Sequence, residues 1–313
     1  MKQLLHDSFL RQRSWLGGIV RFVRPFMAYK VLGRVSPVLA SYKITHKCNL
    51  KCLHCPYWKR PSEDQSFEGV IKTLQMLRRA GVLILILEGG EPLLWKDGGR
   101  DIRDVVATAR RLFPSVCMTT NGTLPWGDLP LNRVWVSLDG PEEMNDSLRG
   151  KGVFEAVFRN IERGSQAQRV FASITISALN IHSIPELISF LKGRVAGATI
   201  QFYYPYQGLP DPLYVELNER RRVLNHLIEM KRQGYPIVNT EMSLRELQRS
   251  RWLCEDRLLA NADPDGTISH GCYLKNRGPS VCELCGFTAH NEMTLAFHGN
   301  IASIRTGLAT FFQ

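Results

Sequence analysis

Short apolar segments of strand length recur along the chain from residue 41 to residue 203. The segment 82–87 is almost uniformly apolar, which is typical of a strand that is covered on both faces. The six predicted strands are residues 41–45, 82–87, 115–119, 133–138, 170–177 and 198–203.

Helical patterns lie between these strands. After Ser66, a candidate N-cap, apolar residues recur every three or four positions as far as Leu77, and Gly81 marks the end of that helix. Further helices are predicted over 101–112, around 154–161, near 185–191 and over 213–233. Strands that alternate with helices predict an α/β protein with a parallel sheet and right-handed crossovers. Periodicity alone does not distinguish a doubly wound sheet from a barrel.

The first 40 residues have a different pattern. They carry seven Lys or Arg residues against a single acidic residue. Five of their apolar residues fall on one helical stripe, namely Ile19, Phe22, Val23, Phe26 and Met27. Gly17, Gly18 and Pro25 interrupt the pattern, so an N-terminal segment of short amphipathic helical pieces is predicted. Two interpretations stay open: contact with an anionic bilayer through residues 1–35, or a helix packed on the protein's own core.

Composition and charge narrow the class of protein. The chain has 313 residues, 44% of them hydrophobic, and a net charge of +11, which fits a globular protein with one large domain and an appendage. No apolar run approaches the roughly 20 residues of a membrane-spanning helix, and the charged N-terminus forms no secretory signal. Outside residues 1–40 the charges form no comparable basic cluster, so nucleic acid is not an expected partner.

These observations predict a cytoplasmic protein, either free or in peripheral contact with the inner face of the membrane. The chain contains eight cysteines. In a reducing compartment their chemistry is more often metal binding than disulfide formation. The cysteine pattern therefore becomes the main source of functional information.

Three of the cysteines are closely spaced after the first predicted strand. Cys48, Cys52 and Cys55 have the spacing C-x3-C-x2-C. Three thiolates hold three corners of a four-iron cluster and leave the fourth iron without a protein ligand. An open coordination position is typical of a catalytic metal site rather than a structural one. A zinc site or three unrelated thiols is the alternative on spacing alone.

A second set of four cysteines lies downstream. Cys254, Cys272, Cys282 and Cys285 have the spacing C-x17-C-x9-C-x2-C, and the turn signal at 263–266 predicts a hairpin in the first gap. Four thiolates saturate either a zinc ion or an iron–sulfur cluster, and spacing does not decide between them. The remaining Cys117 falls within a predicted strand and is expected to be a small core residue.

The motif C-x3-C-x2-C after a strand resembles the signature of the radical S-adenosylmethionine (SAM) superfamily. The resemblance implies a partial (β/α)6 TIM-like barrel with its active site at the C-terminal ends of the strands. It also implies that the open iron binds SAM and that one electron cleaves SAM to a 5′-deoxyadenosyl radical, with flavodoxin or ferredoxin as the electron donor. The family usually has an aromatic residue where this chain has His54, whose planar ring can also stack on adenine.

Polar and glycine residues after the predicted strands extend the resemblance. Gly89-Gly90-Glu91-Pro92 looks like the family's GGEP motif, in which Glu91 would contact the SAM ammonium group. Ser137 and Asp139 would contact the SAM carboxylate or ribose, and Arg149 would pair with a carboxylate, although a solvated loop charge is its ordinary role. The resemblance thus assigns to cofactor binding the residues His54, Gly89, Gly90, Glu91, Asn121, Ser137, Asp139, Arg149 and Thr175.

The C-terminal cysteines resemble the start of the SPASM and twitch extensions of many radical SAM enzymes. The resemblance implies one auxiliary [4Fe–4S] cluster on Cys254, Cys272, Cys282 and Cys285. Residues 271–287 are also weakly similar to enzymes that attach an adenosyl group to hopene lipids. The predicted organisation is therefore a basic amphipathic segment over 1–40, a radical SAM core barrel over 41–237 and a small auxiliary-cluster domain over 238–313.

The predicted function is that of a radical SAM enzyme, either an oxidoreductase or a transferase. A membrane isoprenoid or another lipid is the first candidate substrate, because it explains the N-terminal segment. A peptide is the alternative, because SPASM-type members mature peptides. A non-enzymatic zinc or iron–sulfur binding module is the second alternative. No catalytic hydrogen donor or base is assigned; Cys117, Tyr203 and Tyr204 are residues to test.

Overall fold

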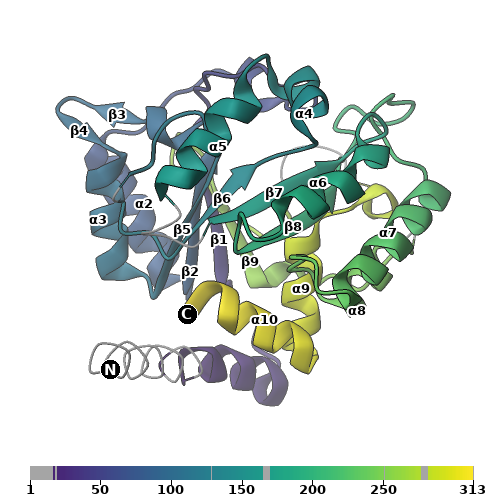
Figure 1. Cartoon of the computed structure of the whole chain (residues 1–313). Helices are drawn as coiled ribbons and strands as arrows, with labels where there is room; N and C mark the ends of the chain where they lie inside the picture. Colours follow the sequence, from purple (N-terminus) through teal and green to yellow (C-terminus); the bar gives the residue numbers. More distant parts are fainter. Residues whose placement is uncertain are drawn as a thin grey trace, which may run out of the picture.

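The computed structural model describes residues 17, 20–127, 129–164, 170–249, 251–275 and 281–312. Its core is an eight-stranded sheet in the order β10-β9-β1-β2-β5-β6-β7-β8, with helices around it (Figure 1). The strands are β1 (Leu39–Thr45), β2 (Ile84–Gly89), β5 (Ser115–Thr120), β6 (Arg133–Ser137), β7 (Val170–Ile176), β8 (Gly197–Phe202), β9 (Leu259–Ala262) and β10 (Ile268–His270). The six predicted strands are all present.

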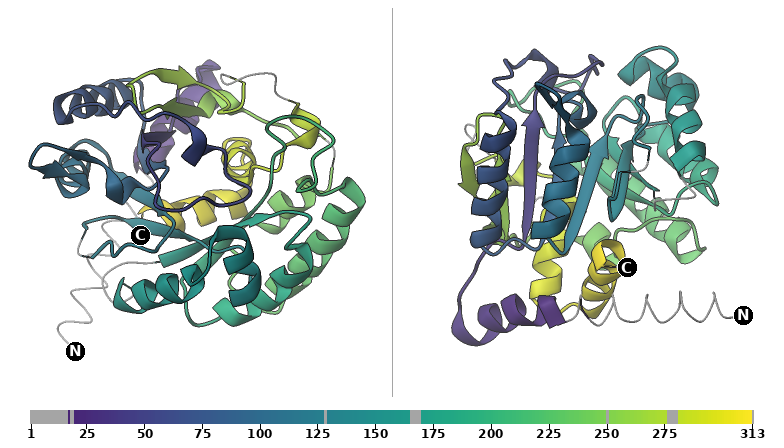
Figure 2. Two further views of the ribbon diagram at one scale, coloured as in Figure 1. Left: turned by 90° about the horizontal axis from the view of Figure 1, so that it is seen from above. Right: turned by 90° about the vertical axis from the view of Figure 1, so that its left-hand side faces the viewer.

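The strand order decides between the two architectures that periodicity left open. From β1 to β8 the neighbours follow the chain order, and every pair is parallel. A doubly wound sheet would reverse its order at a switch point, whereas a barrel does not. Seen from above, the strands curve around a common centre (Figure 2). The sheet is open among the described residues, with β8 and β10 at its edges, so the predicted partial barrel is confirmed.

Amphipathic helices cover the outer face of this sheet. Ser66 caps α2 as predicted, because its side chain accepts a hydrogen bond from the Gly69 amide at 3.3 Å. Apolar residues of the helices form one core with the strands. The helices of this layer are α2 (Phe67–Arg79), α3 (Ile102–Leu112), α4 (Glu142–Arg149), α5 (Val153–Gly164), α6 (Ile184–Leu191) and α7 (Leu217–Arg232). Of these, α4 was not predicted, because its six polar or charged residues out of eight conceal its buried face.

The predicted hairpin between Cys254 and Cys272 is present as β9 and β10. Strand β9 also pairs in parallel with β1, so the hairpin extends the sheet of the core. The C-terminal part of the chain adds α8 (Glu241–Glu246), α9 (Thr288–Phe297) and α10 (Ile301–Phe312), and a short hairpin of β3 (Lys96–Asp97) and β4 (Arg100–Asp101) precedes α3. The division into three segments at 40 and 237 stays a prediction.

Helices α9 and α10 lie inside the curve of the sheet, at the end where its strands begin (Figures 1 and 2). Below them the chain is helical over residues 20–32. Phe22, Phe26 and Tyr29 of that helix pack on Phe297 of α9, with ring centroids 5.2, 6.1 and 5.7 Å apart. This helix therefore packs on the protein's own core, which was one of the two interpretations left open.

The predicted interruption at Pro25 is wrong, because residues 20–32 form one continuous helix. Proline removes only one backbone hydrogen bond, and packing of the aromatic face compensates for that loss. Residues 1–16, 18 and 19 lie outside the described residues. Within the described part of the chain, no helix is long and apolar enough to span a bilayer.

Candidate functional site

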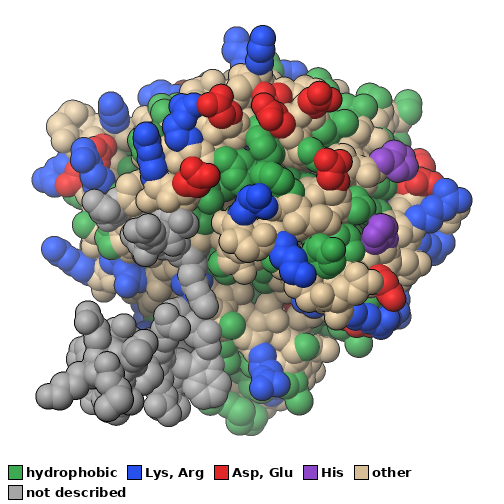
Figure 3. Space-filling view, viewed as in Figure 1, with side chains coloured by type: hydrophobic (Ala, Val, Ile, Leu, Met, Phe, Trp, Pro, Cys, Tyr) green, Lys and Arg blue, Asp and Glu red, His purple; other side chains and the backbone are tan. Residues whose placement is uncertain are grey.

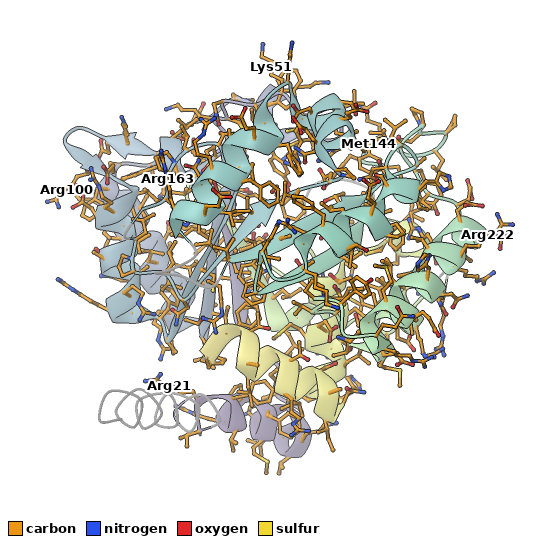
Figure 4. The ribbon with its side chains drawn as sticks, in the orientation of Figure 1. Arg21, Lys51, Arg100, Met144, Arg163 and Arg222 are labelled. Carbon is orange, nitrogen blue, oxygen red and sulfur yellow. The ribbon has the colours of Figure 1, made fainter. Side chains whose placement is uncertain are left out.

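The three closely spaced cysteines lie in the loop that follows β1, at the end of the molecule opposite helix 20–32. Figure 4 shows Lys51 of this loop at one end and Arg21 of the helix at the other. The loop is anchored by the backbone after β2: the Gly90 amide donates to the Thr45 carbonyl at 2.7 Å, and the Glu91 amide donates to the Lys47 carbonyl at 2.8 Å. The position of the cysteines thus depends on the strand next to them.

Gly89 and Gly90 are required for this close approach. A Cβ on Gly89 would lie 2.2 Å from the Thr45 carbonyl oxygen, and one on Gly90 would lie 2.2 Å from the Lys47 carbonyl oxygen. Gly89 also has φ +137°, which side-chain-bearing residues rarely adopt. Both glycines line the cavity described next, so they shape the cysteine loop as well as a ligand-facing wall.

A cavity of about 340 Å³ opens at the C-terminal ends of the strands. This volume falls in the range of small-molecule sites, roughly 300–1,000 Å³. We call it the site cavity. Eight of the predicted site residues besides the two glycines line it, namely Cys48, Cys52, His54, Cys55, Asn121, Ser137, Arg149 and Thr175. They come from the cysteine loop and from the ends of β5, β6, β7 and α4, and the fold therefore brings distant segments together at one place.

Glu91 does not line the site cavity. It is fully buried, and its carboxylate accepts hydrogen bonds from Thr120 Oγ1 at 2.9 Å and from the Asn121 and Leu93 amides at 2.8 and 3.2 Å. Burial raises its pKa to about 7, against these hydrogen bonds, which lower it. Its observed role is to hold the turn after β5, and contact with SAM stays a prediction for this residue.

Asp139 is also fully buried and faces protein groups rather than the cavity. One carboxylate oxygen accepts from the Thr175 amide at 2.8 Å, and the other lies 2.6 Å from Arg149 Nη2 and 3.5 Å from His54 Nε2. The Arg149 side chain is only 7% exposed, so it is not a solvated loop charge. Asp139 therefore fixes two cavity-lining side chains, of which His54 has its pKa lowered by burial.

Burial and one nearby cation shift the pKa values of the thiols in this loop in opposite directions. Burial raises the pKa of Cys52 to about 11 and raises those of Cys48 and Cys55, while the Arg149 guanidinium lowers the pKa of Cys52 and Cys55. Arg149 Nη1 lies 4.0 Å from Cys52 Sγ. Buried thiols of this kind stay protonated until a metal displaces the protons.

Asn121 reaches the same loop from β5. Its Nδ2 donates to Asn49 Oδ1 at 2.8 Å and lies 3.8 Å from Cys48 Sγ. Among the described residues, no group of three or more Cys, His, Asp or Glu side chains is arranged to hold a single metal ion. A four-iron cluster needs its thiolates farther apart than a single ion does, since each thiolate ligates a separate iron.

The C-terminal cysteines also lie near one another. Cys272, Cys282 and Cys285 all raise the pKa of Cys254, whose largest shift comes from burial. Cys285 and Cys282 share one turn, because the Cys285 amide donates to the Cys282 carbonyl at 3.1 Å. Cys254 and Cys282 are exposed, whereas Cys272 and Cys285 are partly buried. Cys117 is fully buried beside Trp135 and Phe171, as expected of a core residue.

The structure adds residues that the sequence analysis missed. Lys43 and Glu88 form an ion pair of 2.7 Å inside the barrel and line the site cavity. A lysine within the apolar strand β1 was the signal that was overlooked. Tyr203 and Tyr204, which the sequence analysis named only as residues to test, line the cavity too. The Tyr203 hydroxyl bonds Asp211 at 2.9 Å, and the Tyr204 hydroxyl accepts from the Val281 amide at 3.0 Å.

Comparison with known proteins agrees with this geometry. The family profile "Radical SAM superfamily" matches residues 42–191. Fe-coproporphyrin III synthase of Methanosarcina barkeri is 29% identical over 62% of this chain and 53% of its own length. Sporulation killing factor maturation protein SkfB of Bacillus subtilis is 29% identical over 56% of this chain and 44% of its own. The chain thus spans about half the length of the curated relatives it matches.

The fold is that of a solved relative as well. The crystal structure of Streptococcus suis SuiB bound to S-adenosylmethionine superposes with a TM-score of 0.62 at 14% identity, over 87% of this chain and 66% of that one. Residues 42–191 of the chain thus form a radical SAM domain, the domain that defines the radical SAM superfamily of enzymes. The chain carries a SPASM-like C-terminal extension. The superfamily uses a [4Fe–4S] cluster and SAM, and SPASM-type members carry auxiliary clusters.

Proposed function

We propose that this protein cleaves SAM reductively and uses the resulting radical on an organic substrate held in the site cavity. One observation carries the proposal: three thiols converge on a single cavity together with polar groups from the ends of the neighbouring strands. When bound, the cluster and SAM supply a one-electron cleavage of the sulfonium carbon–sulfur bond that yields the 5′-deoxyadenosyl radical.

The residues present fit these cofactors. Cys48, Cys52 and Cys55 would hold the cluster. Arg149, held by Asp139, would place its positive charge beside the thiolates and opposite a carboxylate ligand. Asn121, Ser137 and Thr175 offer hydrogen-bonding groups on the same wall.

The four C-terminal cysteines would hold one auxiliary cluster, which either relays electrons or shapes the substrate pocket. Two of them are exposed, which gives a one-electron donor such as flavodoxin or ferredoxin access to this end of the molecule. A cytoplasmic location, where such donors occur, belongs to the same proposal.

Anaerobic reconstitution tests the proposed function. We expect about eight iron and eight sulfide ions per chain, four of each for every cluster, and formation of 5′-deoxyadenosine from SAM under a strong reductant. A non-enzymatic zinc or iron–sulfur module predicts no such product. Tightly held zinc with no 5′-deoxyadenosine would therefore reject the proposal in favour of that alternative.

Two substrate classes remain in competition. SuiB has also been crystallised bound to the precursor peptide SuiA, and the relative SkfB is a maturation protein of the sporulation killing factor, so a peptide is supported by similarity. A membrane lipid is supported by helix 20–32, whose outer face exposes Val20, Val23, Met27 and Val31 beside basic residues. Positive and negative side chains are interspersed on the face that Figure 3 shows.

Vesicle sedimentation separates these classes. We expect wild-type protein to bind vesicles that contain anionic lipid, and Met27→Asp to weaken that binding roughly tenfold, because it removes inserted apolar surface and one net positive charge. Met76→Asp on α2 is the matched control, since Met76 is 46% exposed and Met27 is 48% exposed. Equal binding by both variants would argue against contact through this helix and favour a peptide substrate.

A further inference from the structure

A second cavity lies inside the barrel, beneath the site cavity. It has a volume of about 260 Å³ and lies between the concave face of the sheet and helices α9 and α10. Leu39, Ile84 and Trp135 line it from the strands, and Met293 and Phe311 line it from the two helices. We call it the inner cavity. Nothing in the proposed cleavage of SAM requires it.

The inner cavity adjoins the site cavity. Several residues line both, among them Ile86, Ser173 and Ala289. The ion pair of Lys43 and Glu88 marks the level at which they meet, because Glu88 lines both cavities and Lys43 lines only the upper one. Of the two adjoining cavities, the site cavity therefore carries more of the charged and polar groups, and the inner cavity is the more apolar.

Two of the larger polar side chains on the wall of the inner cavity, Glu292 and Asn239, are hydrogen-bonded to the protein itself. Glu292 accepts hydrogen bonds from the Thr240 amide at 2.6 Å and from Ser303 Oγ at 2.8 Å. Asn239 exchanges two hydrogen bonds with the backbone of Ile200, at 2.8 and 3.1 Å. Such groups need no ligand, so the space that remains favours an apolar occupant.

The lower end of the inner cavity reaches helix 20–32, because Phe22 lines it. The opposite face of that helix exposes Val23 and Met27. An apolar molecule in a bilayer under the helix would therefore have a short path, past Phe22, into the barrel. The inner cavity in turn adjoins the site cavity, which the cysteines of the loop line.

From this arrangement we infer that the inner cavity binds a long hydrocarbon chain, acyl or isoprenoid, and holds the rest of that molecule in the site cavity. The inference rests on the proposed function, since it assigns the substrate class of the same site. Burial of the hydrocarbon chain supplies the affinity. The Lys43–Glu88 pair selects a polar group at the end of the hydrocarbon chain that enters the site cavity.

Tryptophan fluorescence tests binding directly. The reconstituted full-length protein is titrated with a dibrominated octadecanoate, with unbrominated octadecanoate as the blank. Bromine quenches indoles that it contacts, and we expect quenching in the wild type and its loss in Trp135→Phe. Phytol, an isoprenoid alcohol, should compete with the probe, and a tetraleucine peptide should not.

Gly307→Leu is the cavity-filling variant. Gly307 lies on α10, lines the inner cavity and has open space where a Cβ would be, so the leucine side chain should occupy the ligand's volume and weaken binding of the probe about tenfold. Ala302→Leu is the control, because it adds the same side chain on the exposed face of that helix. Ala289→Leu, at the junction of the two cavities, is a second filling variant in case the first does not fold.

Three results would overturn the inference: quenching that persists in Trp135→Phe, equal affinity in folded Gly307→Leu and Ala302→Leu, or competition by the peptide alone. Formation of 5′-deoxyadenosine by the wild type is measured separately. Probe binding without that product would reject the proposed function and leave the cavity as a binding site. Product without probe binding would reject only the inference.

Discussion

Cys52→Ala is expected to halve the iron content and abolish cleavage of SAM. Cys52 is the most buried thiol of the loop, at 7% exposure, and lines the site cavity with Cys48 and Cys55. Loss of one of three ligands leaves two corners of a cluster unsupported, so we expect about four irons per chain, all at the C-terminal cysteines. Iron and sulfide analysis of anaerobically reconstituted protein, together with a 5′-deoxyadenosine assay, measures both effects.

Cys117→Ala is the matched control for this prediction. Cys117 is also buried, and burial raises its pKa to about 11, as it does for Cys52. It lies in a core cluster with Trp135 and Phe171 and lines neither cavity. We expect full iron content and cleavage in Cys117→Ala. Full iron content in Cys52→Ala would contradict the assignment of the loop as the catalytic cluster site.

The order of elements was predictable from the sequence because buried parallel strands leave a plain signal. Segment 82–87 is apolar on both faces and became β2, and the Ser66 cap begins α2 as expected. Strand order was not predictable from periodicity, which is a local property whereas pairing is not; the order of a barrel was implied only by the family resemblance. The pairing of β9 with β1 likewise joins segments more than 200 residues apart.

The sequence predicted which residues form the candidate site, but it did not predict the directions in which their side chains point. The residues that the motifs picked out do meet at one edge of the sheet. However, Glu91 and Asp139 direct their carboxylates to protein donors, and Asp139 acts through Arg149. A sequence motif gives a residue's position, whereas hydrogen-bond partners depend on the packed neighbours. The inner cavity could not be predicted from the sequence for the same reason, because α9 and α10 meet the sheet only in the folded chain.

Gly90→Ala is expected to reduce cleavage of SAM about a hundredfold. Its Cβ would lie 2.2 Å from the Lys47 carbonyl oxygen and 2.5 Å from that of His46, and both atoms are backbone. The segment that carries Cys48 must then move, and a displacement of about 1 Å in an active site costs about a hundredfold in rate. The C-terminal cysteines lie on other elements, so the auxiliary cluster should persist.

Gly99→Ala provides the control, since no atom lies within 4 Å of the Cβ it would add. Gly99 sits between β3 and β4, away from the cysteine loop. Comparison of the two variants by thermal unfolding, iron content and 5′-deoxyadenosine formation separates a shifted loop from general loss of stability. If Gly90→Ala retained wild-type cleavage, the loop would have to tolerate displacement, and the close contact between the backbones after β1 and β2 would not be what positions the thiols.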